Sequence, residues 1–381
     1  MNKKVLLFSR DPGGANTVVP LYEKLKEEGY NVKIYGKDVA LNRYEQYGLK
    51  GIDISGSLSY ISEDGIYKFL LEEAPDFLIT GTSADDFTEK YLWKCAERLK
   101  IPSFAILDQW INYGLRFSKF GVSQLKEYEK KKEHIYLPYK ILVMDNYSKE
   151  QMIKEGIPED KILISGQPYF DYLISKKETI SDKVIKDFRK IIGFDMEDYI
   201  ITYASEPLSK TYGESDTSEH YWGYSERSIF KEFINVLNQV RQKTNRKIGL
   251  IIRLHPKEDE NNYNDLIDNI NDNISILIDK KLDGFKLICT SNLICGMSSM
   301  FLIESAALGK SIISMQMGLN RDNPFILDKI GAVKSILYTK ELEEKIEKFV
   351  MNDKNEGYEF KIQKGAIDNI INFMEEIICR Y

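Results

Sequence analysis

Short apolar runs alternate with amphipathic stretches along most of the chain. The runs are about five residues long, rich in β-branched and large apolar side chains, and bounded by turn residues, which is typical of buried strands. Stretches between them, such as DDFTEKYLWKCAERLK, place apolar residues at helical spacing. This alternation predicts βαβ units around a parallel sheet. The six strands predicted in the first half are residues 4–8, 31–35, 76–80, 103–107, 140–144 and 161–165.

The same pattern restarts in the second half. A long amphipathic helix over residues 225–244 follows the first apolar run, and a helix with small residues over 298–309 precedes the last one. A second doubly wound domain is therefore predicted. Its five predicted strands are residues 198–205, 247–256, 273–279, 292–297 and 311–316.

The chain has 381 residues, which is longer than one hydrophobic core usually supports. We expect an α/β fold class with two doubly wound Rossmann-like domains that face each other across a cleft. Residues 1–170 form the predicted N-terminal domain and residues 171–355 the second domain, joined through GQPYFDYLISKKETISD. Residues 356–381 are predicted to form a final helix that crosses back onto the first domain.

Charge and composition exclude several functional classes. The net charge is −6 with acids and bases mixed, so the expectation is no nucleic-acid partner. The basic run LKEYEKKKEHIY is interleaved with glutamates and predicts a solvated helix face, with contact to a membrane surface as the alternative. Apolar runs are shorter than the roughly 20 residues of a membrane-spanning helix. The four scattered cysteines suggest a reducing compartment, so we expect a cytoplasmic protein, with the inner face of the membrane as a second location.

The first strand is followed by a glycine-containing loop, DPGGAN. It lacks the G-x-G-x-x-G spacing of dinucleotide-binding folds, and Gly36 stands where such folds have an acid. We therefore expect Gly13 and Gly14 to let another ligand, assigned to the donor, approach the backbone and the positive end of the next helix. Asp11 is a candidate general base in this loop. The alternative is a turn that only joins strand to helix.

The segment RLHPKED ends a predicted strand of the second domain. It places Arg253 and His255 at the carboxyl end of the strand, and Pro256 stops the strand there. Side chains of these types at a strand end can hydrogen-bond and neutralise a phosphate leaving group. A histidine with a purely structural role is the alternative.

A second segment, GMSSMFLIESAALG, has the signals of a capped helix. Ser298 or Ser299 is the predicted N-cap and Gly309 the predicted end. The free amides of the first turn, with two hydroxyl groups, suit a phosphate. Glu304 lies further along the helix, where a carboxylate can accept hydrogen bonds from a ribose diol.

These two segments together resemble the donor domain of GT-B glycosyltransferases. The His-Pro pair followed by a Ser-Ser turn is most similar to inverting transferases that use CMP-activated acidic sugars or CDP-glycerol. The resemblance implies that His255, Ser298 and Ser299 hold the donor phosphate, that Glu304 meets the ribose, and that Arg253 assists. It also implies no metal and no cofactor.

One feature of the resembling enzymes is missing. The CMP-sialic acid enzymes have an acidic pair plus glycine upstream of His-Pro, which supplies the base. The nearest upstream candidate here is Glu206 in YASEPLSK, which lacks that pattern and which we assign to the donor site, and Asp283-Gly284 lies downstream. The identity of the donor and of the base therefore stays open.

Two loops of the first domain are assigned to the acceptor. GTSADDFTEK and LDQWINYGLRF follow consecutive predicted strands and place Ser83, Glu89, Asp108, Trp110 and Tyr113 at the cleft edge. Trp110 and Tyr113 are predicted to stack on sugar rings while Ser83 contacts hydroxyl groups. Asp108 is the second candidate base. Local packing of the aromatic rings is the alternative.

The long segment 205–226 shows neither helix nor strand periodicity. A loop of this length in a compact domain is usually functional or disordered, and we expect a lid over the donor site that includes His220, Tyr221 and Trp222.

The function predicted from these features is transfer of a sugar. A nucleotide-sugar donor, CMP- or UDP-linked, would give its sugar to a surface polysaccharide, glycolipid or glycoprotein acceptor. One alternative is an enzyme similar to UDP-GlcNAc 2-epimerases or a nucleotide-sugar hydrolase, and another is a nucleotide- or sugar-binding module without catalysis.

Overall fold

The computed structural model describes residues 3–58, 60–268, 270, 273–352 and 364–378. The chain divides into two compact units. Unit 1 comprises Met1–Tyr172 and Ile362–Tyr381, and unit 2 comprises Leu173–Lys361. The predicted boundary at residues 355–356 lies outside the described residues. The helix α7, Pro168–Thr179, begins in unit 1 and ends in unit 2.

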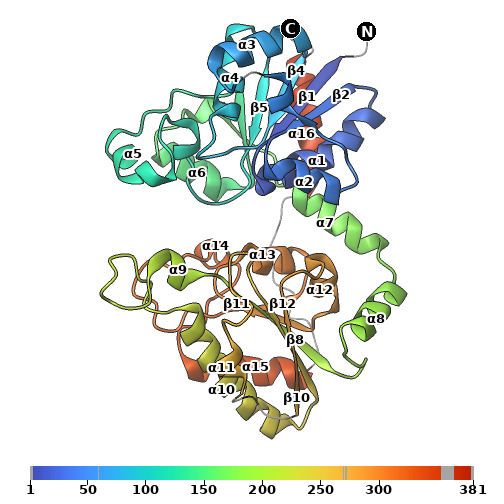
Figure 1. Ribbon diagram of the computed structural model, residues 1–381, viewed down its shortest axis with the longest axis vertical. Coiled ribbons are helices and arrows are strands. Elements are labelled where there is room, and N and C mark those ends of the chain that lie inside the picture. Colours follow the sequence, from blue (N-terminus) through green and yellow to red (C-terminus); the bar gives the residue numbers. More distant parts are fainter. Residues whose placement is uncertain (1–2, 59, 269, 271–272, 353–363, 379–381) are drawn as a thin grey trace. The chain divides into compact units, whose positions relative to one another are not determined.

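Unit 1 is built on a parallel sheet with the strand order β3-β2-β1-β4-β5-β6-β7 (Figure 1). The six predicted strands are present, but the sheet has a seventh strand, β3, which the sequence pattern did not indicate. Both residues of β3 are exposed, so it has no apolar signal. The strands are β1 Lys4–Ser9, β2 Asn31–Gly36, β3 Ile52–Asp53, β4 Phe77–Thr80, β5 Ser103–Ile106, β6 Lys140–Val143 and β7 Ile162–Ile164.

Apolar cores cover both faces of this sheet. Along β1, Leu6 and Phe8 belong to one core while Val5 and Leu7 belong to the other, as the alternation of side chains in a strand requires. Burial on both faces explains the continuous apolar run. The helices of unit 1 are α1 Pro12–Glu27, α2 Val39–Gln46, α3 Glu63–Glu73, α4 Thr88–Arg98, α5 Leu125–Lys131, α6 Asn146–Lys154 and α16 Ala366–Ile378.

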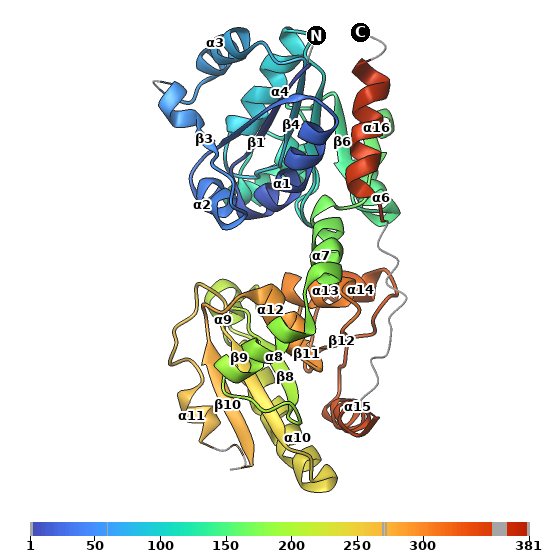
Figure 2. The same cartoon turned by 90° about the vertical axis from the view of Figure 1, so that its right-hand side faces the viewer.

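The C-terminal helix α16 packs on unit 1 beside α1 (Figure 2). Its apolar residues Ile370 and Met374 join the core of one sheet face. Asp171 of α7 accepts hydrogen bonds from the amides of Gly365 and Ile367 at 3.2 and 3.1 Å and so caps the start of α16.

Unit 2 has a five-stranded parallel sheet with the order β10-β9-β8-β11-β12. The five predicted strands are confirmed: β8 Tyr199–Ala204, β9 Ile248–Arg253, β10 Ile274–Asp279, β11 Leu293–Gly296 and β12 Ser311–Ser314. The helices are α8 Asp182–Ile191, α9 Leu208–Tyr212, α10 Glu226–Thr244, α11 Asn264–Ile267, α12 Gly284–Thr290, α13 Met300–Ala307, α14 Ile326–Lys329 and α15 Thr339–Asn352.

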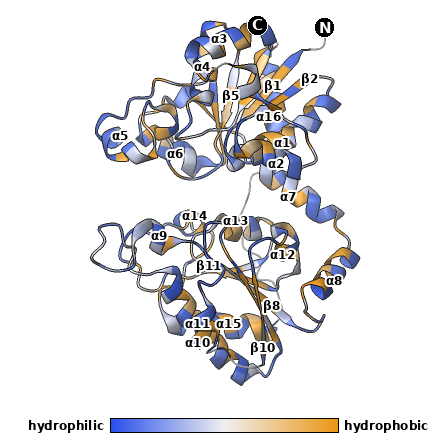
Figure 3. Cartoon of the chain, in the orientation of Figure 1, coloured by the Kyte–Doolittle hydropathy of each residue, from blue (hydrophilic) through white to orange (hydrophobic). Residues whose placement is uncertain are grey.

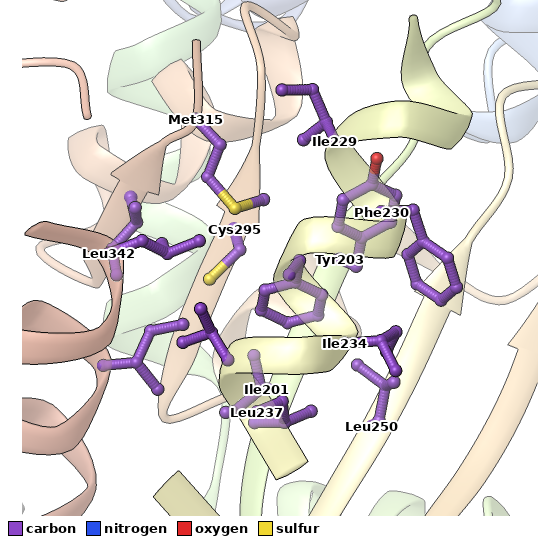
Figure 4. Packing of buried hydrophobic residues seen from close by; sticks show 14 of the residues in the cluster. Ile201, Tyr203, Ile229, Phe230, Ile234, Leu237, Leu250, Cys295, Met315 and Leu342 are labelled. Carbon is purple, nitrogen blue, oxygen red and sulfur yellow. The ribbon is translucent and has the colours of Figure 1, made fainter. Parts of the chain in front are cut away.

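The main core of unit 2 lies between this sheet and helices α10 and α15. Tyr203 of β8 stacks on Phe233 with ring centroids 5.5 Å apart, and the sulfur-containing side chains of Cys295 and Met315 fill the space toward Leu342 (Figure 4). The central strands are mainly apolar, whereas most helices carry both apolar and polar residues (Figure 3). Both units therefore have the Rossmann-like α/β architecture that the sequence predicts.

Candidate functional site

In unit 2 the direction of winding reverses between β8 and β11. Parallel sheets of this kind bind ligands beyond the carboxyl ends of their strands at such a switch point. Glu206 lies two residues after β8, and Ser298 two residues after β11. The carboxylate of Glu206 accepts hydrogen bonds from the Ser298 amide at 2.6 Å and from the Ser298 hydroxyl at 3.0 Å. The two predicted site residues therefore meet at the switch point.

The turn before α13 has the helix cap that its sequence pattern predicts. Ser299 is the N-cap, and its hydroxyl accepts a hydrogen bond from the Phe301 amide at 3.2 Å. The group at this turn is the side chain of Glu206. Burial raises the pKa of Glu206 to about 7, against the opposing effect of hydrogen bonds from Ser298 and the Ser299 amide. Near neutral pH this carboxyl therefore takes up and releases a proton readily.

His255 follows β9 and is partly buried. Its Nδ1 accepts a hydrogen bond from the Lys257 amide at 3.1 Å, which leaves the ring proton on Nε2. Burial, with the positive charges of Lys257 and Lys280, lowers the pKa of His255, so the ring is neutral at pH 7. Within the described residues Nε2 has no hydrogen-bond partner, and its N–H is available to an acceptor. Pro256 is exposed at the strand end.

A buried network holds the loop that includes His255. Glu258 accepts a hydrogen bond from the His255 amide at 2.7 Å and another from the Ser205 hydroxyl at 2.6 Å. Ser205 also bonds to the hydroxyl of Tyr263, which is fully buried. Because Ser205 directly follows β8, this network joins the tips of β8 and β9 and holds the backbone of His255 near Glu206.

Arg253 makes more contacts within the protein than the sequence suggests. Its guanidinium donates to the carbonyl of Leu282 at 2.9 Å, lies 3.7 Å from the Asp279 carboxylate, and covers the ring of Phe301. Burial lowers its pKa, while Asp279 and then Glu304 oppose that effect. Arg253 therefore joins the tips of β9 and β10 to α13. The carboxylate of Glu304, the other predicted site residue here, is close enough for its charge to act on Arg253.

The segment 205–226 and the loop after β12 contain residues whose positions the sequence did not predict. The segment 205–226, expected to be a lid, contains the short helix α9 and folds back onto the unit 2 core. Trp222 is only 8% exposed and stacks on Tyr212 with ring centroids 4.4 Å apart, so the prediction that Trp222 is part of a lid is wrong. Tyr224 is buried as well, and His220 is exposed. Arg321, in the loop after β12, covers the ring of Trp222.

The switch point of unit 1 lies between β1 and β4 and is closely packed. A Cβ atom at Gly81 would lie 2.7 Å from the Cα atom of Gly14, so two backbones touch there. A Cβ atom at Gly13 would lie 1.8 Å from Oδ2 of Asp108. The carboxylate of Asp108 therefore lies against the first turn of α1. An acid at this position disfavours the predicted contact of Gly13 and Gly14 with an anionic donor.

The two candidate bases differ in their surroundings. Asp108 is 7% exposed and forms an ion pair with Arg116 at 2.7 Å, and Arg116 also donates to the Thr82 hydroxyl at 2.9 Å. Asp11 is partly exposed and pairs with Arg10 at 2.6 Å. Asp11 is thus the more accessible of the two.

Glu89 is a third carboxyl group at this edge. It is fully buried, its Oε2 accepts a hydrogen bond from the Ser83 amide, and its Oε1 has no hydrogen-bond partner in the described structure. Burial first, then the negative charges of Asp11, Asp86 and Asp108, raises the pKa of Glu89 to about 8. Glu89 is therefore mainly protonated at pH 7.

The predicted acceptor residues are less exposed than expected. Tyr113 is 7% exposed within the unit 1 core, so the prediction that its ring stacks on a sugar is wrong. Ser83 is 1% exposed, and its hydroxyl accepts a hydrogen bond from the Asp86 amide at 3.2 Å. Trp110 is partly exposed, donates to Asp145 at 2.7 Å and stacks on Phe170. Local packing, the alternative given above, accounts for Tyr113 and Ser83.

Within the described residues, no cluster of three or more histidine, cysteine or acidic side chains could hold a metal ion. Likewise, no helix in this part of the chain is both long and apolar enough to cross a membrane.

Solved structures with the same fold cover nearly the whole chain. UDP-GlcNAc 2-epimerase from Methanocaldococcus jannaschii matches with a TM-score of 0.70 and 15% identity, over 98% of this chain and 99% of that one. The Neisseria meningitidis UDP-GlcNAc 2-epimerase bound to UDP-GlcNAc gives 0.65 and 17%, over 98% and 100%. A glycosyltransferase from Rickettsia africae gives 0.60 and 14%, over 99% and 98%. At these identities the likeness establishes the fold, which is that of the GT-B class.

A family model narrows this class. The model described as CDP-Glycerol:Poly(glycerophosphate) glycerophosphotransferase matches residues 101–323, more than half of the chain. The chain therefore belongs to this glycerophosphotransferase family. No curated protein matches the sequence.

Proposed function

We propose that the protein is a transferase that takes an activated group from a nucleotide donor and passes it to a hydroxyl group of a surface polysaccharide, glycolipid or glycoprotein. The observation that supports this most is the switch point of unit 2. There the Ser298 turn, a neutral imidazole with a free N–H and an ionisable carboxyl lie on adjacent strand ends. Amide and imidazole donors are suited to the negative charge that develops on a departing phosphate.

We assign the roles in this proposal as follows. The Ser298 and Ser299 turn and Nε2–H of His255 hold the phosphate of the departing nucleotide, and Glu304 meets the ribose. Asp11 is the better candidate base because it is more exposed than Asp108. The leaving group is stabilised by these hydrogen-bond donors, so we propose that catalysis needs no metal. Full activity in a chelator supports this, whereas loss of activity that magnesium or manganese restores contradicts it.

Two kinds of donor fit the proposed site. With a CMP- or UDP-sugar, the acceptor oxygen attacks the anomeric carbon, inverts it and releases the nucleotide. With CDP-glycerol, the acceptor oxygen attacks the phosphorus that bears glycerol, the bond to CMP breaks with its electron pair on CMP, and the base takes the hydroxyl proton. Membership of the glycerophosphotransferase family favours the second donor.

Substitution of His255 tests the proposal. In nucleotide-release assays with CDP-glycerol, CMP-sugars and UDP-sugars, His255→Ala should lower kcat about 10²- to 10³-fold, because a donor to the leaving group is lost. His220→Ala is the matched control, since this ring is exposed in a loop. Equal kcat values for wild type and His255→Ala contradict the proposal. Turnover of a UDP-sugar without acceptor would instead favour an epimerase or hydrolase, and binding without turnover a non-catalytic module.

A peripheral membrane contact is a further part of the proposal, with the protein in the cytoplasm. Around α5 the exposed apolar residues Val122, Leu125 and Ile135 are 44%, 39% and 53% exposed. Exposed lysines over residues 126–132 lie among them. Cosedimentation with anionic vesicles that weakens at high salt supports this contact. Equal cosedimentation of a Leu125→Ser/Ile135→Ser variant would contradict it.

A further inference from the structure

Arg321 has a cationic side chain that no residue of the described chain neutralises. It is exposed in the loop after β12, and no ion pair or hydrogen bond to its guanidinium occurs within the described residues. The guanidinium carbon lies 5.5 Å from the centroid of the Trp222 ring. That ring in turn stacks on Tyr212 at 28°. This cation–π contact leaves the N–H groups of the guanidinium available to a ligand.

The loop that includes Arg321 is held in place by backbone contacts. A Cβ atom at Gly223 would lie 1.9 Å from the carbonyl oxygen of Gly318, and both glycines have positive φ, of 91° and 87°. The Asn320 amide also donates to the Trp222 carbonyl at 3.1 Å. Because only glycine fits this approach, the backbone of the loop that includes Arg321 is held against the backbone beside Trp222.

The same loop adjoins the Ser298 turn. Gln316 accepts a hydrogen bond from the Tyr224 hydroxyl at 2.5 Å and donates to the Met297 carbonyl at 3.1 Å, one residue before Ser298. Since β12 is the direct neighbour of β11, on the side away from β8, the loop that follows β12 leaves the sheet next to the Ser298 turn. Burial raises the pKa of Tyr212, which Arg321 opposes and Glu206 reinforces, so both charges act on this ring.

We propose that Arg321 binds the second phosphate of a donor linked through a diphosphate, while the Ser298 turn and His255 hold the first. Arginine presents a planar set of N–H donors that matches a phosphate. Nε1 of Trp222 is buried without a partner in the described structure and lies in the same cluster. The inference rests on the proposed function and narrows its substrate class. CDP-glycerol or a UDP-sugar has two phosphates and would be favoured over a CMP-sugar, which has one.

Calorimetric titration of CMP, CDP, UMP and UDP tests this inference on the full chain. The wild type should bind the diphosphate of its preferred base at least about tenfold more tightly than the monophosphate, as a hydrogen bond to a charged group implies. Arg321→Gln should reduce that ratio below about threefold and leave monophosphate affinity within threefold. Arg321→Lys should give an intermediate ratio, since the charge stays and the fork is lost.

Arg246→Gln is the matched control. Arg246 also covers an aromatic ring, that of Tyr199, but it precedes β9 and so lies at the amino end of the strands, opposite the proposed site. Its removal should leave the diphosphate preference unchanged. If Arg321→Gln keeps the wild-type ratio while its melting temperature is unchanged, the inference is overturned and the proposed function stands. If the wild type binds none of the four nucleotides, both are overturned.

Discussion

Replacing the buried carboxyl of Glu89 should stabilise unit 1 in a pH-dependent way. The folded pKa of about 8 lies well above the ordinary value of 4.5, so an ionised Glu89 is disfavoured in the folded state. In the unfolded chain Glu89 ionises freely, so the free energy of unfolding falls as pH rises from about 4.5 to about 8. The resulting cost is about 3 kcal/mol at pH 7 and below about 1 kcal/mol at pH 5. Glu89→Gln removes the cost and keeps an oxygen for the Ser83 amide.

Guanidinium unfolding at pH 5, 7 and 8 measures this effect. In a Trp222→Phe background the remaining tryptophans, Trp93 and Trp110, report on unit 1 alone. Glu89→Gln should gain little at pH 5 and about 3 kcal/mol at pH 7. Glu97→Gln is the control, because Glu97 is exposed on the same helix, α4. An equal gain at pH 5 and pH 8, or a loss at both, would refute the account of Glu89 as a buried, protonated acid.

Three further changes test other parts of the structure. Gly13→Ala places a Cβ atom 1.8 Å from the Asp108 carboxylate and should destabilise unit 1 by about 1–3 kcal/mol in the same guanidinium unfolding experiment. Gly56→Ala is the control and should have no such effect, because no atom lies within 4 Å of its added Cβ. Equal effects of the two changes would contradict the close packing at Gly13. Affinity for a UDP-sugar should fall about tenfold from pH 6 to pH 8, because Glu206 ionises and its carboxylate competes with the phosphate for the Ser298 turn. In Glu206→Gln the affinity should not change with pH over this range. A pH dependence that persists in this variant would refute the competition. Asp171→Ala should cost about 1 kcal/mol and speed hydrogen exchange in α16 but not in the core of unit 2, and unchanged exchange in α16 would contradict its capping role.

The sheets and the positions of strand ends were predictable from sequence because their signals are local. A buried parallel strand is a continuous apolar run, and the Ser299 cap with Gly309 marks a helix within a few residues. The strand β3 gave no signal, since both of its residues are exposed.

Contacts between distant segments were not predictable. Trp222 is buried next to the close approach of Gly223 and Gly318, and Arg321, 99 residues further along the chain, covers its ring. Nothing near Tyr113 in the sequence indicates that its loop returns to the core. The pairing of Glu206 with Ser298 likewise joins residues 92 positions apart. Gly223 and Gly318 are typical turn residues, so the sequence indicates a turn at each position but not the contact between them.

The most direct measurement is hydrogen exchange by mass spectrometry with and without CDP or UDP at saturating concentration. If the strand ends of unit 2 hold the departing nucleotide, peptides spanning residues 253–258 and 296–301 should gain protection while peptides of the β1 and β4 ends in unit 1 change little. Protection confined to the loop at Gly13 and Gly14, or no change at residues 296–301 despite measured binding, would contradict the account.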